Sequence, residues 1–217
     1  PHMAFGLRDG LKFGNVEMRD SMWDSLTNLG IGPAMGITAE NVAEKYGVTR
    51  REMDEFALAS QQRVVAAQDA GKFSDEIVPV EVPCKKGSVV LETDEYPRRD
   101  STMEALAKLK AVFKDNGTVT AGNASGMNDA ASGVLLAGAR EAAEWGLPAM
   151  AKIVAVATTG VDPEVMGIAP VSAITRALEK AGLSIKDIDL FEINEAFAAQ
   201  CLACQKTGAI ELTPDAL

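Results

Sequence analysis

The residues best suited to chemistry form a polar corner, Asn194 and Glu195, directly after an apolar run over residues 188–193. A run of small residues at 196–203 follows and is typical of a helix. Polar side chains between a strand and a helix lie where open α/β sheets bind ligands. The Asn194 amide could donate to a developing oxyanion, or hold a water that does so. The alternative is structural, with Asn194 and Glu195 capping the helix.

A second candidate site is the stretch over residues 117–129, which is rich in small and polar residues. Small residues let a backbone approach a ligand closely, and amide and hydroxyl groups bind polar ligand atoms. The same composition also suits an ordinary surface loop. Both interpretations stay open on composition alone.

Metal, redox and histidine chemistry find little support in the sequence. The histidine is His2, and the cysteines are Cys84, Cys201 and Cys204. Cys201 and Cys204 have CxxC spacing, but no second pair accompanies them, so we expect a buried helix face and no metal. Cysteines without a disulfide framework favour a reducing, cytoplasmic compartment.

Composition and charge argue against two other functions. The net charge is -10, which opposes sequence-independent binding of nucleic acid. No stretch of 18 apolar residues exists, so we expect no membrane span. The length of 217 residues suits one or two domains with a buried core.

The elements that position the candidate residues begin with a helix over 50–70. Thr49 and Glu52 form a capping box at its start, and Gly71 ends it. One face carries residues at helical spacing that we expect to face the core: Met53, Phe56, Ala57, Ser60, Val64 and Ala67. The charges on the helix, Asp54 among them, are expected to be solvated.

Two further elements are predicted before residue 128. A short helix over 39–46 has Thr38 as its expected N-cap. Strands over 76–82 and 88–92 form a hairpin, with Cys84 in its connection.

From residue 130 onward the sequence predicts alternating strands and helices. Strands are expected at 130–137, 151–159 and 188–193, and helices at 140–145, 171–181 and 196–203. The first two strands lack clean alternation of apolar and polar residues, which suits strands buried under helices on both faces. This order indicates an α/β fold.

Several stretches together resemble the thiolase family, which makes or cleaves 3-ketoacyl-CoA. They follow the family's order and cover essentially the whole chain: 35–43, 56–61, 117–126, 162–167 and 194–198. The resemblance implies an incomplete, layered α-β-α-β-α thiolase fold with an α+β loop domain. The implied division is a loop domain over 1–127, the last strands and helix of the N-terminal domain over 128–160, and the start of the C-terminal domain over 161–217.

Thiolases run a two-step Claisen condensation or its reverse, with a cysteine nucleophile, a histidine that activates it and a second cysteine that moves the α-proton. The resemblance implies that Asn194 holds a water in an oxyanion hole. It places Ser125, with Ala121 and Gly126 beside it, on the pantetheine part of CoA, and Arg98 near the CoA nucleotide. It also implies apolar walls for the CoA and acyl channel, for which core packing is the alternative: Leu26, Met35, Leu109, Phe113, Met166 and Phe197.

The departures from the family pattern concern the reacting groups themselves. The nucleophilic cysteine would precede Pro1, and the Gly-His-Pro and Cys-x-Gly-Gly-Gly motifs would follow Leu217. The resemblance therefore implies an interior fragment that is inactive alone, drawn from a homodimer or homotetramer that uses acyl-CoA and coenzyme A as substrates and needs no cofactor. Ala34 replaces a histidine of short-chain biosynthetic members, and the 191–194 and 166–170 stretches look closer to degradative thiolases. The alternatives are a non-catalytic acyl-CoA-binding module and a subunit of a split thiolase.

Overall fold

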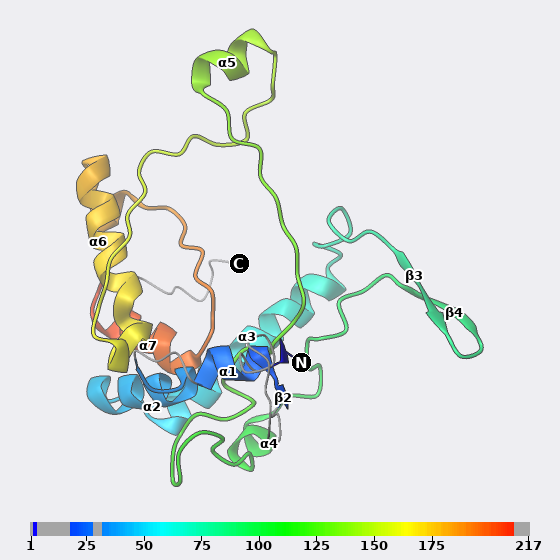
Figure 1. Cartoon of the computed structure of the whole chain (residues 1–217), viewed down its shortest axis with the longest axis vertical. Coiled ribbons are helices and arrows are strands. Elements are labelled where there is room, and N and C mark those ends of the chain that lie inside the picture. The colour runs from blue at the N-terminus through cyan, green and yellow to red at the C-terminus, as the bar shows by residue number, and fades with distance from the viewer. Residues whose placement is uncertain (1, 4–17, 28–31, 211–217) are drawn as a thin grey trace, which may run out of the picture.

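The computed structural model describes residues 2–3, 18–27 and 32–210. Its elements in chain order are β1 (His2–Met3), β2 (Met18–Arg19), α1 (Ser21–Thr27), α2 (Met35–Tyr46), α3 (Arg50–Asp69), β3 (Val80–Cys84), β4 (Gly87–Leu91), α4 (Met103–Ala107), α5 (Ala139–Glu144), the 3₁₀ helix η2 (Pro163–Ile168), α6 (Ala169–Ala181), the 3₁₀ turn η3 (Ile185–Asp187) and α7 (Ala198–Lys206). Figure 1 shows their arrangement. None of the described helices combines the length and apolarity that a bilayer crossing requires.

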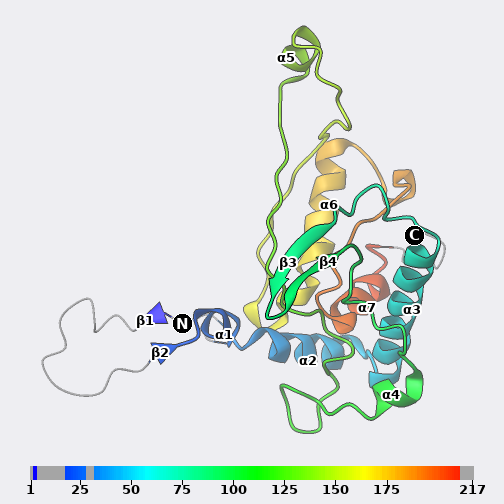
Figure 2. The ribbon, with the colours of Figure 1, turned by 90° about the vertical axis from the view of Figure 1, so that its right-hand side faces the viewer.

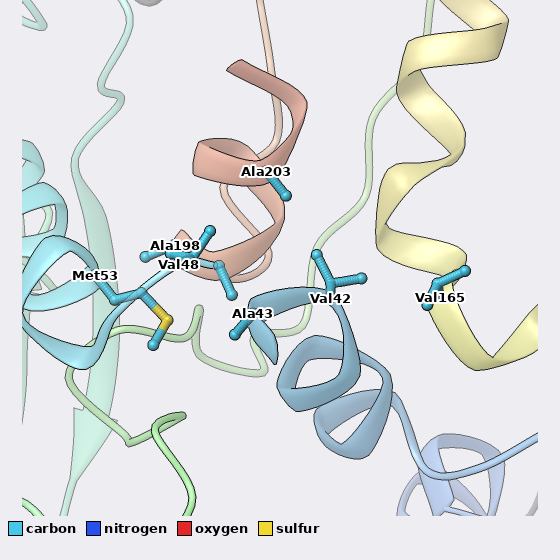
Figure 3. Close-up of a cluster of buried hydrophobic side chains, with 8 residues drawn as sticks. Val42, Ala43, Val48, Met53, Val165, Ala198 and Ala203 are labelled. Atoms are coloured by element: carbon cyan, nitrogen blue, oxygen red, sulfur yellow. The ribbon is translucent and has the colours of Figure 1, made fainter. Parts of the chain in front are cut away.

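The core lies where α2, α3, η2 and α7 meet. Its buried side chains are mostly small: Val42, Ala43, Val48, Met53, Val165, Ala198, Ala199 and Ala203. Figure 3 shows them converging from α2, α3, η2 and α7. Small side chains let helix axes approach closely, so α7 can lie in the middle with six of its nine residues buried.

Helix α3 confirms the strongest local prediction. The Thr49 hydroxyl accepts from the Glu52 backbone N–H at 3.2 Å, and the Glu52 carboxylate accepts from the Thr49 backbone N–H at 2.6 Å. The helix ends at Asp69, and Gly71 adopts a φ of +68° that favours glycine. Lys206 of α7 reaches back to Glu52 at 3.0 Å, so the box also joins α3 to α7.

Helix α2 begins four residues earlier than predicted, at Met35, and its N-cap position is Ala34. The expected cap, Thr38, is wrong: it lies inside the first turn, where its hydroxyl donates to the Met35 carbonyl at 2.7 Å. A threonine hydroxyl that binds the preceding turn is compatible with a helix interior, so the residue type alone did not mark the boundary.

The remaining helices and the hairpin agree with the sequence to within a few residues. Helices α5, α6 and α7 are present, and β3 pairs with β4 in antiparallel register from Val80↔Leu91 to Cys84↔Gly87. Cys84 is thus the last residue of β3, and its side chain is exposed.

The three strands predicted at 130–137, 151–159 and 188–193 are wrong as paired strands. The structure forms no strand in these ranges. Figure 1 and Figure 2 show the first two as extended segments that carry α5 at their far end. A strand needs a neighbour for its backbone groups, and no described segment lies beside these runs in a sheet.

The contacts of Glu52 predict that the free energy of unfolding depends on pH. Its hydrogen bonds from Thr49 and its contact with Lys206 lower its pKa from 4.5 to about 2. A lowered folded-state pKa adds stability above pH 4.5 that is lost as the pH falls toward 2. We expect Glu52→Gln to flatten the loss of stability in this window, measured by urea unfolding between pH 6 and 2. The exposed Glu92→Gln is the control, and equal slopes for wild type and Glu52→Gln would contradict the prediction.

Candidate active site

The loop over residues 117–126 is held at its start by a buried carboxylate. Glu40 of α2 is 4% exposed and accepts from the Thr118 and Val119 backbone N–H groups, at 2.8 Å each, and from the Thr118 hydroxyl. Gly117 passes so close that a Cβ there would lie 2.3 Å from Glu40 Oε1. The glycine is therefore required by the approach of this backbone to Glu40.

Asn123 organises the middle of the loop. Its side-chain N–H₂ donates to Asp54 Oδ1 at 3.0 Å and to the Thr118 carbonyl at 3.1 Å, and its Oδ1 accepts from the Thr120 N–H at 2.8 Å. Asn123 is 3% exposed. Its amide therefore ties the loop to α3 and closes the loop on itself.

Asp54 was expected on the solvated face of α3, and that expectation is wrong. The residue is 2% exposed, and its Oδ2 pairs with Arg50 Nε at 2.7 Å. Arg50 Nη2 in turn donates to the carbonyls of Leu106 and Leu109, at 2.6 and 3.1 Å. A buried carboxylate needs such partners, because an unpaired charge away from water is costly.

The loop also pairs with the polar corner that precedes α7. The Ser125 N–H donates to the Ala196 carbonyl and the Ala198 N–H donates to the Asn123 carbonyl, both at 3.0 Å, around a β-bridge between Ala124 and Phe197. The two stretches singled out from the sequence thus lie side by side. The surface-loop interpretation of 117–129 is wrong for residues 117–125, which hydrogen bonds tie to α2, α3 and the polar corner, whereas the exposed residues 126–129 agree with it.

The helix-cap interpretation of Asn194 and Glu195 is also wrong. The N-cap position of α7 is Phe197, and no side chain caps it. Glu195 Oε2 accepts instead from Ser60 Oγ of α3 at 2.7 Å. The exposed Asn194 side chain makes no hydrogen bond with any described residue, so its amide is available to a ligand.

These elements line a cavity of about 700 Å³ that is half open to solvent, and its volume is within the range of small-molecule sites. Five of the predicted site residues line it: Arg98, Leu109, Ala121, Ser125 and Asn194. Sequence reasoning did not place Phe56, Ser60, Gln61 and Tyr96 in the site. The 56–61 stretch, which resembles the family, is the signal that could have placed Phe56, Ser60 and Gln61 in the site. We assigned Phe56 and Ser60 only to the core face of their helix.

The other predicted site residues lie outside the cavity lining. Gly126 is adjacent, where a Cβ would lie 2.2 Å from Tyr96 Oη. Phe113 and Phe197 stack edge to face with centroids 6.4 Å apart. Met35 opens α2, Leu26 lies in α1, and Met166 is 39% exposed on η2.

The charged side chains that line the cavity are one cation and three carboxylates. Arg98 is the one cation among the described lining residues, which also include the carboxylates of Asp94, Asp100 and Glu195. Its backbone N–H is fixed by Gln61 Oε1 at 2.7 Å, whereas its guanidinium forms no ion pair with a described carboxylate. An anionic ligand can therefore pair with Arg98 without breaking an existing contact.

The thiols beside this site are buried and poorly ionised. Burial is the main cause that raises the pKa of Cys201 to about 12, with the charge of Glu195 adding to it, and burial raises the pKa of Cys204 to about 11. A thiol is a nucleophile as its thiolate, so neither is suited to attack a thioester near neutral pH. Within the described residues, no three His, Cys, Asp or Glu side chains are grouped as metal ligands would be.

Residues 1–140 match the family model for the thiolase N-terminal domain, and residues 147–214 match that for the thiolase C-terminal domain. The chain belongs to the thiolase family. The resemblance and the predicted fold class, an incomplete thiolase-like α/β fold, are thereby confirmed. The finer boundaries expected at 127/128 and 160/161 stay predictions.

Among thiolases, the chain is similar to an acetyl-CoA acetyltransferase of Pseudomonas aeruginosa, with 53% identity over 94% of this chain and 52% of that protein. It superposes on the crystal structure of the Bacillus anthracis acetyl-CoA acetyltransferase with a TM-score of 0.87 and 44% identity, over 97% of this chain and 54% of that one. It also superposes on human mitochondrial 3-ketoacyl-CoA thiolase in complex with CoA, with a TM-score of 0.81 and 44% identity, over 95% and 51%. The chain thus spans about half the length of these thiolases.

The buried hydrogen bonds of Asn123 predict that removing its side chain lowers the free energy of unfolding. Asn123→Ala leaves the Asp54 carboxylate and the Thr120 N–H without this partner, and an unsatisfied buried polar group costs about 1–3 kcal/mol. We expect a loss of free energy of unfolding in that range, measured by urea denaturation. Asn128→Ala, at an exposed asparagine farther along the same segment, should change stability little. Equal stabilities for the two variants would contradict the role of Asn123.

The cysteines predict a pattern of thiol reactivity. Cys84 is exposed, whereas Cys201 and Cys204 are buried. We expect a thiol reagent at pH 8 to modify Cys84 in the folded chain, and all three cysteines after unfolding in urea. Cys84→Ser should abolish the fast reaction. Fast labelling of α7 in that variant, mapped by mass spectrometry, would contradict the burial of this helix.

Proposed function

We propose that this chain is the acyl-CoA-binding part of a thiolase-type acyltransferase, which converts 3-ketoacyl-CoA and CoA into acyl-CoA and acetyl-CoA, or runs the reverse Claisen condensation. One observation carries the proposal: the unpaired amide of Asn194 and the hydroxyl-bearing Ser125 line the same cavity. The names of the relatives, acetyl-CoA acetyltransferase and 3-ketoacyl-CoA thiolase, support it.

In this proposal the described residues bind and polarise the substrate. Asn194 donates to the thioester or enolate oxygen, directly or through a water, and so stabilises negative charge as it develops. Ser125 hydrogen-bonds the pantetheine part of CoA, and Arg98 pairs with a phosphate of its nucleotide. Coenzyme A is a substrate here, and no cofactor is invoked.

The nucleophile is not among the described residues. Cys201 and Cys204 are buried and largely protonated at neutral pH, and Cys84 lies on the exposed hairpin. This observation keeps a second candidate function in view, a non-catalytic acyl-CoA-binding module with the same cavity. The direction of the reaction, the acyl chain length, the homo-oligomeric state and the cytoplasmic location stay predictions.

A chimera tests the proposed function. This chain replaces the matched 209-residue region of the Pseudomonas aeruginosa acetyl-CoA acetyltransferase, and thiolysis of acetoacetyl-CoA is followed by absorbance. We expect turnover, and we expect Asn194→Ala in the chimera to lower kcat by roughly 10²–10³, the usual effect of losing one oxyanion donor. Asn128→Ala should leave kcat unchanged. A folded Asn194→Ala chimera with full kcat would overturn the role of Asn194, and a folded chimera that binds CoA without turnover would favour the binding module.

A further inference from the structure

Ser60 of α3 donates its hydroxyl to a residue far away in the sequence. Its Oγ lies 2.7 Å from Oε2 of Glu195, which is 135 residues later. A hydroxyl inside a helix commonly bonds a carbonyl of the preceding turn, and Thr27 of α1 and Thr175 of α6 do so at 2.7 and 2.9 Å. Ser60 makes no such bond among the described residues. Its hydroxyl therefore serves Glu195 and not its own helix.

Glu195 lies at the tip of a tight turn beside the cavity. The Ala196 N–H donates to the Asn194 carbonyl at 2.9 Å, which closes a three-residue turn around Glu195. The Ala196 carbonyl accepts from the Ser125 N–H at 3.0 Å, which fixes the turn at one end. Asn194, Glu195 and Ser60 all line the cavity. The Glu195 carboxylate and the Asn194 amide thus belong to consecutive residues around the same space.

The Glu195 carboxylate depends on Ser60 for its position. Among the described residues, the Ser60 hydroxyl is its one hydrogen-bond donor, and no cation forms an ion pair with it. A carboxylate binds N–H donors more strongly than a neutral acceptor does. A Glu195 side chain released from Ser60 can therefore turn toward the Asn194 amide, or bring its charge to the place of a developing oxyanion.

The charge of Glu195 already acts on its surroundings in the observed arrangement. Burial raises the pKa of the Cys201 thiol to about 12, and the charge of Glu195 adds to this shift. An oxyanion in the cavity is an anion like the Cys201 thiolate, so it is disfavoured by the same charge. The direction in which the carboxylate is held therefore matters for the reaction.

We propose that Ser60 is a positioning residue for the oxyanion donor. Its hydroxyl holds the Glu195 carboxylate against α3 and so keeps the Asn194 amide free for the substrate oxygen. This inference rests on the proposed function, because Asn194 meets an oxyanion in the acyltransferase reaction.

The first test uses the 217-residue chain and needs no activity. Nuclear magnetic resonance follows the side-chain amide signals of Asn194, which are assigned by their loss in Asn194→Ala. We expect Ser60→Ala to shift these proton signals downfield, because the released carboxylate accepts from the amide. Ser88→Ala is the matched control. It removes another serine–glutamate hydrogen bond, from Ser88 to Glu81 on the hairpin outside the cavity lining, and should leave the Asn194 signals unmoved.

The second test uses the chimera described above and thiolysis of acetoacetyl-CoA. We expect Ser60→Ala to lower kcat by roughly 10-fold, less than the loss of Asn194 itself, because the donor is present but less often in place. KM should stay about unchanged, since Ser125 and Arg98 are retained. In a chimera that already carries Asn194→Ala, adding Ser60→Ala should lower kcat no further, because Ser60 acts through Asn194. Ser88→Ala should leave kcat and KM unchanged.

Three results would overturn the role of Ser60. They are unmoved Asn194 signals in folded Ser60→Ala, full kcat in the folded Ser60→Ala chimera, and a further loss of kcat when Ser60→Ala is added to Asn194→Ala. A chimera that is inactive with Ser60 in place contradicts the proposed function instead. The Asn194 signals of the chain alone then decide whether Ser60 keeps the amide free.

Discussion

The hydrogen bond between Asn123 and Asp54 is the interaction on which the candidate site depends. It joins α3 to the 117–126 loop inside the molecule, where a carboxylate is tolerated only with charged and hydrogen-bonded partners. Arg50 supplies the charge and also binds the carbonyls near the end of α4. The loop must therefore follow one path, and that path presents the Asn123 carbonyl and the Ser125 N–H to the segment before α7. The position of Asn194 is a consequence of a buried acid 140 residues earlier in the chain.

Helix α7 provides the second constraint, through the small size of its buried side chains. It packs among α2, α3 and η2 mostly with alanine and cysteine side chains, and leucine in place of its buried alanines would separate these helices. The same burial makes its thiols unreactive, because it withholds the solvation that a thiolate needs. Close packing thus fixes the corner at Asn194. It also separates binding, the role proposed for this region, from nucleophilic chemistry, for which the thiols of α7 are unsuited.

Local signals predicted what local interactions decide. The capping box at Thr49, the glycine after α3 and the hairpin around Cys84 depend on residues within a few positions, and all were recognised from the sequence. Asp54 was misplaced because its environment is set by Asn123, which is 69 residues away. The runs at 130–137 and 151–159 have the composition of strands, but pairing depends on a neighbour that no periodicity can reveal. In the site, Asn194 followed from its place after a predicted strand, and Ser125 and Arg98 from the resemblance to the family. Ser60 was assigned to packing and instead binds Glu195.

The charge distribution of the cavity limits what Asn194 can do alone. Glu195 adjoins it, and its negative charge is felt as far as the Cys201 thiol. An oxyanion formed beside Asn194 would meet the same repulsion, which one neutral amide offsets only in part. Ser60 holds the Glu195 carboxylate toward α3, which orients this charge and leaves the Asn194 amide unoccupied. In the proposed reaction the oxyanion therefore requires additional donors.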